Sequence, residues 1–131
     1  MFNLHRLVAA LFAFQVFALP ATSASAQTPA ATRHYIYVLR LVPRLHDPKN
    51  WTERDNLAVS EHFKRLQQAT AQGKVLLAGR TDEPPDKTFG IVVFEAADDA
   101  AAREFMETDP TLVAGVMSAT VHPYSVALLR R

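Results

Sequence analysis

An amphipathic helix that runs directly into a buried strand is the feature that most constrains this fold. The segment is LAVSEHFKRLQQATAQGKVLLAG, residues 57–79. At about 100° per residue, His62 shares one side of this helix with residues that are mostly apolar or small. These residues are Ala58, Val59, Phe63, Leu66, Ala69 and Thr70. We therefore expect His62 to point toward whatever the helix packs against.

The ends of this helix carry their own signals, which predict a helix over residues 51–72. Asn50 with Glu53 is typical of a capping box at the start. Gly73 suits a left-handed residue just past the end. After Gly73, residues 74–81 are predicted to form a strand.

Strands and helices follow one another in an order that identifies the fold class. Strands are predicted over residues 34–42, 74–81, 89–95 and 119–129, helices over residues 51–72 and 98–108, and one further helical turn over residues 109–115. The order is strand, helix, strand, strand, helix, strand. It predicts an α+β, ferredoxin-like βαββαβ fold, in which two helices cover one face of an antiparallel sheet.

Two of these strands are apolar on both sides, although an antiparallel sheet with one wet face should alternate apolar and polar residues. The strands over residues 34–42 and 89–95 have this character. Two helices cover only one face of a sheet. We therefore expect a second copy of the chain to cover the other face, which predicts a homodimer.

The first 26 residues have the layout of a secretory signal peptide. A positively charged start is followed by an apolar run over residues 7–19, and Ala24-Ser25-Ala26 is a small-x-small cleavage signal. An uncleaved membrane anchor is the alternative interpretation. The prediction is a signal peptide over residues 1–26, a linker over 27–33 and one domain over 34–131. The mature protein is expected to be secreted or periplasmic, with no stable membrane anchor after cleavage.

Charge and composition exclude several classes of protein. Without residues 1–26, the chain has equal numbers of basic and acidic residues, and no basic run is interleaved with aromatic residues. Nucleic acid is therefore not an expected partner. There is no cysteine, and the histidines lack the i,i+4 spacing of a helical metal site. We expect neither a metal nor a cofactor.

Two stretches resemble a known family, the YciI-like (YCII-related) domain. They are SEHFKRLQQATAQGKVLLAG and FGIVVFEAADDAAAREFMETDPTLVAGVMSATVHPY. The resemblance implies a dimeric α/β barrel, and an active-site pair of histidine and aspartate that corresponds to His62 and Asp109. It also implies chemistry such as dehydrohalogenation or lactone conversion in a few relatives.

The chain departs from that family pattern at two positions. Val59 stands where many members have arginine, and Arg80 stands where proline is common. If the usual arginine holds an anionic ligand, that role is either lost in this chain or moved to Arg40, Arg54 or Arg80. The alternative for Arg80 is a solvated loop residue.

Each candidate residue also has a purely structural interpretation. A histidine on an apolar helix face is often a core residue. Asp109 before Pro110 is a good N-cap for the turn that closes at Gly115. Tyr35, Tyr37 and Tyr124 are interpreted as core or dimer-interface aromatics.

The sequence therefore predicts an exported protein that binds a small organic ligand in a cavity between sheet and helices. His62 and Asp109 are its candidate catalytic residues, and Arg80 and Arg40 are weaker candidates for ligand binding. The expected chemistry is cofactor-free proton transfer of the isomerase, lyase or dehydrohalogenase type. The alternatives are a non-catalytic binding or structural dimer and an accessory subunit of another exported protein.

Overall fold

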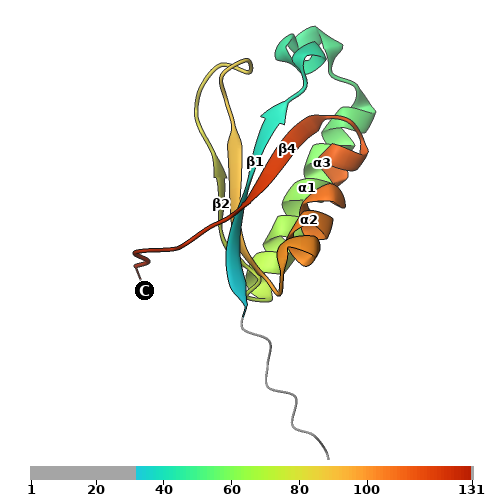
Figure 1. The fold of residues 1–131 in the computed structure, drawn as a ribbon. Coiled ribbons are helices and arrows are strands. Elements are labelled where there is room, and N and C mark those ends of the chain that lie inside the picture. Colours follow the sequence, from blue (N-terminus) through green and yellow to red (C-terminus); the bar gives the residue numbers. More distant parts are fainter. Residues whose placement is uncertain (1–31, 131) are drawn as a thin grey trace, which may run out of the picture.

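A computed structural model describes residues 32–130, and they form one antiparallel sheet covered on one face by helices (Figure 1). The strands are β1 (Arg33–Leu41), β2 (Val75–Arg80), β3 (Gly90–Ala96) and β4 (Met117–Pro123), in the order β2-β3-β1-β4. The helices are α1 (Glu53–Ala71), α2 (Asp99–Glu107) and the single turn α3 (Pro110–Val113), and two 3-10 turns, η1 (Pro43–His46) and η2 (Pro48–Asn50), precede α1. The predicted α+β, ferredoxin-like fold is confirmed. The predicted signal peptide lies outside the described residues.

The core lies between the helices and the inward side of β1 and β3. Tyr35, Tyr37 and Phe94 are fully buried there. The Phe94 ring lies 5.6 Å from the Tyr37 ring and 4.8 Å from the ring of Phe105 on α2, measured between ring centroids. This aromatic cluster joins the two central strands to α2.

The N-terminus of α1 differs from the prediction, because the capping box is formed by Thr52 and Asp55. The Thr52 hydroxyl accepts a hydrogen bond from the Asp55 N–H, and the Asp55 carboxylate accepts one from the Thr52 N–H at 2.9 Å. Asn50 instead belongs to η2, and its side chain donates to the carbonyl of Arg44. Arg44 also donates two hydrogen bonds to Asp55, which, with the Thr52 bonds, hold the pKa of that carboxyl well below its usual range.

The packed face of α1 is narrower than the sequence pattern predicts. Ala58, Leu66 and Ala69 are buried as expected, but Phe63 is 62% exposed and Thr70 is also exposed. The prediction for these two residues was wrong, because the helix is rotated so that polar residues share its inward face. Those residues are Asp55, which is buried, and His62 and Arg65, which are partly buried.

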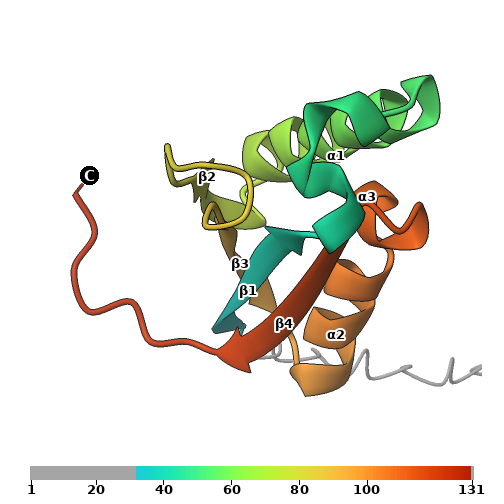
Figure 2. The same ribbon diagram turned by 90° about the horizontal axis from the view of Figure 1, so that it is seen from above.

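The helices of the described residues cover only one face of the sheet (Figure 2). The strand register places apolar residues on the other face. The strand register places Leu77 beside Val93 on this face and Val38 beside Ile91. Leu77 is 55% exposed, whereas Val93 is buried by its neighbours. The two-sided character predicted for β1 and β3 is therefore present in the structure.

The last strand is shorter than predicted and ends at Pro123 instead of residue 129. Pro123 pairs with Tyr35, which lies near the start of β1. Beyond this pair, β1 has almost no residues left with which β4 could pair. Its last link is the bond from the Tyr124 N–H to the His34 carbonyl at 2.9 Å. Residues 124–130 then leave the sheet on the side away from the helices (Figures 1 and 2). In the part of the chain that the structure describes, no helix is long and apolar enough to cross a membrane.

A candidate active site around His62 and Asp109

The structure brings His62 and Asp109 into direct contact, although they are far apart in sequence. The His62 Nδ1 atom lies 2.7 Å from Asp109 Oδ2 and 2.9 Å from Oδ1. His62 projects from the inward face of α1, and Asp109 lies in the short link between α2 and α3. The Asp109 side chain is fully buried, and the His62 side chain is 14% exposed. One end of this pair is thus closed to water, and the other reaches the surface.

Asp109 also caps α3, as the sequence predicts. Its Oδ1 atom accepts hydrogen bonds from the Thr111 N–H at 3.0 Å and from the Thr111 hydroxyl at 2.7 Å. Pro110 holds the first helical position, and Gly115 has a φ of 69° just after the turn. The local sequence therefore helps to fix the direction of the carboxylate, through the cap that Asp109 forms on α3.

A tyrosine from the sheet completes the hydrogen bonding of this carboxylate. The Tyr37 hydroxyl donates to Asp109 Oδ2 at 3.0 Å, and both groups are buried. Burial and the neighbouring Asp109 charge raise the pKa of Tyr37 far above its ordinary value. Tyr37 therefore stays protonated and acts as a hydrogen-bond donor.

Arg65, one helical turn after His62, lies on the other side of the carboxylate. Its Nη1 atom is 3.7 Å from Asp109 Oδ2. Its Nη2 atom donates to the Phe105 carbonyl at 2.8 Å and to the Thr108 hydroxyl at 2.9 Å, and its guanidinium lies 4.3 Å above the Phe105 ring. Three contacts at the end of α2 thus fix the position of this cation beside Asp109.

These contacts keep Asp109 ionised in a buried place. Burial alone raises the pKa of the Asp109 carboxyl, but the hydrogen bonds from His62 and Thr111 and the charge of His62 together leave it below its ordinary value. An ionised carboxylate only accepts hydrogen bonds, so His62 Nδ1 must carry a hydrogen. In the neutral ring, the lone pair is then on Nε2, where it can accept a proton.

The two arginines predicted to bind ligand lie elsewhere. Arg40 alternates with the inward residues of β1, so it lies on the uncovered face, where its guanidinium sits 5.2 Å from the Phe89 ring. Arg80 ends β2 and lines a cavity of about 320 Å³ together with Leu77, Gly79, Thr81, Phe89 and Ile91. The structure does not bring either arginine together with His62.

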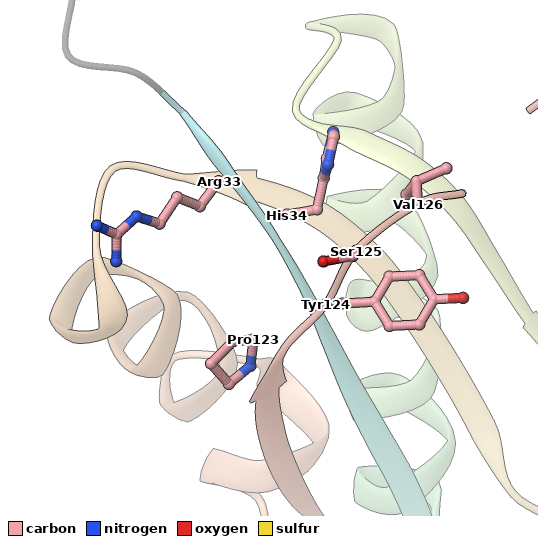
Figure 3. A pocket seen from close by; sticks show the side chains of 6 residues that line it. All are labelled: Arg33, His34, Pro123, Tyr124, Ser125 and Val126. Carbon is pink, nitrogen blue, oxygen red and sulfur yellow. The ribbon is translucent and has the colours of Figure 1, made fainter. Parts of the chain in front are cut away.

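A second cavity, of about 490 Å³, lies between the start of β1 and the C-terminal segment (Figure 3). Arg33, His34, Pro123, Tyr124, Ser125 and Val126 line it. Neither cavity is lined by His62 or Asp109. Among the described residues, no group of three His, Cys, Asp or Glu side chains could hold a metal ion.

Sequence reasoning missed three residues of this site: Tyr37, Arg65 and Thr111. The interpretation of Tyr37 as a core or dimer-interface aromatic describes its ring but not its hydroxyl. Arg65 had a usable signal, because residues three apart on a helix share a face. Thr111 also had a usable signal, because it lies two residues after the N-cap Asp109, where a hydroxyl is close to the capping carboxylate.

The fold is that of a small α+β domain of the ferredoxin-like class, and its candidate site is the buried contact between His62 and Asp109. Residues 39–124 match the model of the YCII-related domain, and the chain belongs to this family. It is also similar to the solved structure of 5-chloro-2-hydroxyhydroquinone dehydrochlorinase from Burkholderia phenoliruptrix AC1100 in complex with 2,5-dihydroxybenzoquinone. That match has 16% sequence identity and a TM-score of 0.48, and covers 70% of this chain and 93% of the other. No curated protein matches the chain.

Proposed function

We propose that this YCII-related protein is a cofactor-free acid–base enzyme that acts on a small organic molecule. His62 is the proposed general base or acid, and Asp109 is the residue that orients it. One observation carries this proposal: the buried Asp109 carboxylate holds His62 through Nδ1, which leaves Nε2 free to exchange a proton. A carboxylate that fixes the tautomer of a histidine in this way is a recurring arrangement in acid–base catalysis.

The reaction class follows from what a single base can do without a metal or cofactor. His62 Nε2 would accept a proton from a carbon beside a carbonyl or from an acidic hydroxyl group. The electron pair of the broken C–H or O–H bond would move toward the neighbouring carbon. It would either expel a leaving group there or shift a double bond. The proton would then pass from His62 to the leaving group, to another substrate atom or to water, which corresponds to lyase, dehydrohalogenase or isomerase chemistry.

The experiment is a comparison of His62→Gln with the wild-type protein on a panel of small organic acids, lactones and halogenated hydroxy compounds, monitored by proton release. We expect wild-type turnover of at least one class and a loss of about 100-fold or more in His62→Gln. Glutamine retains an N–H that can reach Asp109, so the variant should fold. His46→Gln, in η1, is the matched control and should keep full activity. Equal activity of His62→Gln and wild type would end the catalytic proposal.

We also propose that the protein works as a homodimer joined through the uncovered sheet face. The apolar residues of this face support the proposal, since two helices leave them without a cover. Arg40 and Arg80, which border the same face, would then lie near the second copy and remain candidates for ligand binding there.

The dimer is tested by sedimentation of the wild-type protein and two variants at micromolar concentration. Leu77→Asp puts a charge on the uncovered face and should shift the protein to a monomer. Leu57→Asp is the control: Leu57 is also exposed, at 60%, but lies on α1, and its variant should remain dimeric. A wild-type monomer, or a dimer that tolerates Leu77→Asp, would contradict the proposed interface.

The alternative is a non-catalytic binding or structural dimer. It is favoured by one observation, that the two cavities described above lie away from His62. In that case His62 and Asp109 would serve as a buried link between α1 and α3, and the substrate panel would show no turnover by the wild-type protein.

We propose further that the protein is exported and that its signal peptide is cleaved between Ala26 and Gln27. The signal-like sequence over residues 1–26 supports this proposal. N-terminal sequencing of the protein recovered from its host tests this proposal. A start at Gln27 supports it, and a protein that retains Met1 in the cytoplasmic fraction would contradict it.

A further inference from the structure

We infer that Arg65 is the permanent countercharge of Asp109, which allows His62 to release its proton without leaving a buried anion unbalanced. Arg65 is therefore assigned as a positioning residue that acts through Asp109. This inference rests on the proposed acid–base function, which it deepens by naming a third member of the site.

The first reason is the charge balance of the site. Asp109 is fully buried, and a buried charge is costly unless it is paired. Protonated His62 would pair with it, but a base must also exist in its neutral form. With a histidine alone, each loss of the proton would leave the carboxylate with no cationic partner. Arg65 stays charged at every relevant pH and lies 3.7 Å from the carboxylate, so it supplies that partner throughout.

The second reason is an unused donor. Arg65 Nη1 is buried and has no hydrogen-bond partner among residues 32–130. A buried, unsatisfied donor is uncommon and calls for an explanation. It lies within ion-pair distance of Asp109 Oδ2, which already accepts from His62 and Tyr37. Nη1 thus interacts with the carboxylate mainly through charge.

The third reason is that the guanidinium is held in place by groups other than Asp109. The Phe105 carbonyl, the Phe105 ring and the Thr108 hydroxyl fix it at the end of α2. Its position therefore does not depend on the protonation state of His62. A countercharge fixed in advance in this way requires no rearrangement during proton transfer.

A simpler interpretation is that Arg65 only ties α1 to α2. The two interpretations differ in one measurable quantity, the pH at which the His62 ring titrates. The titratable or charged group in contact with His62 is Asp109 from the α2–α3 link, which in turn contacts Tyr37 from β1 and Arg65 from α1. Lys74 lies over the Phe105 ring. Removal of the Arg65 charge should make the protonated ring more favourable, because the carboxylate then lacks its other cation. A pure tether predicts no such shift.

The experiment follows the His62 ring signals by NMR against pH in full-length protein, for wild type, Arg65→Gln, Lys74→Gln and Asp109→Asn. Lys74→Gln is the matched control, because Lys74 Nζ also lies over the Phe105 ring, at 4.1 Å, and its loss changes the net charge equally. In Arg65→Gln we expect the titration midpoint of His62 to rise by about one pH unit or more. In Lys74→Gln we expect a much smaller change.

Equal shifts in Arg65→Gln and Lys74→Gln, or none in Arg65→Gln, would overturn the inference. If Arg65→Gln does not fold, Arg65→Lys replaces it: the midpoint should stay near the wild-type value, and a rise of about one unit would contradict the role of the charge. Asp109→Asn separates the two proposals. If it leaves the His62 titration unchanged, the proposed function fails as well, whereas a shift there with none in Arg65→Gln removes only the role of Arg65.

Discussion

Replacing Asp109 with asparagine should leave the fold intact and yet remove the base function of His62. The oxygen of the new amide would take the place of Oδ1, because the Thr111 N–H and hydroxyl both need an acceptor there. The amide NH₂ would then face His62 Nδ1 and act as a donor. The ring would respond by accepting at Nδ1 and carrying its hydrogen on Nε2, which is the wrong tautomer for a base. We expect activity on any substrate found to fall by about a thousandfold or more.

This prediction can be checked without knowing the substrate. Nitrogen chemical shifts of the neutral His62 ring distinguish the two tautomers. Asp109→Asn should change the ring from the tautomer with hydrogen on Nδ1 to the one with hydrogen on Nε2. Asp99→Asn is a suitable control, since Asp99 also accepts from a tyrosine of β1, Tyr35, at 2.7 Å. It should leave the His62 signals unchanged. An unchanged tautomer in Asp109→Asn, or full activity, would show that the carboxylate does not orient His62.

Truncation of Phe94 to alanine should cause a severe loss of stability. Phe94 is fully buried, and its ring contacts those of Tyr35, Tyr37 and Phe105. Removing a buried phenylalanine side chain typically costs about 3–5 kcal/mol of unfolding free energy, from lost transfer energy and the cavity left behind. The unfolding free energy of small domains is only about 5–15 kcal/mol, so Phe94→Ala should remove a large part of it.

The measurement is denaturant unfolding of Phe94→Ala beside Phe63→Ala. Phe63 is 62% exposed on α1, and its truncation should change the unfolding free energy by no more than about 0.5 kcal/mol. Because Tyr37 contacts both Phe94 and Asp109, Phe94→Ala should also loosen the site. Comparable losses in the two variants would mean that the aromatic cluster is not the centre of the core.

Much of this protein could be predicted from the sequence, because the rules that apply act over a few residues. The order of strands and helices follows from hydrophobic period and from turn residues such as Gly73. The cap at Asp109 follows from the proline after it. The errors also have local causes: Asn50 and Thr52 are both good capping residues, and only the bonds to Arg44 and Asp55 decide between them.

Which side chains meet could be learned only from the folded chain. His62 and Asp109 are 47 positions apart, and Tyr37 and Asp109 are 72 apart. Their contact depends on the strand order, the rotation of α1 and the position of the α2–α3 link together. The rotation of α1 also turns Phe63 outward and Arg65 inward. Hydrophobicity alone predicts the opposite, with Phe63 inward and Arg65 outward. Local sequence thus accounts for the elements and their caps, including the bonds from Thr111 to Asp109. Three-dimensional packing supplies the same carboxylate with His62, Tyr37 and Arg65, because a buried charge is stable only when distant parts of the chain provide partners for it.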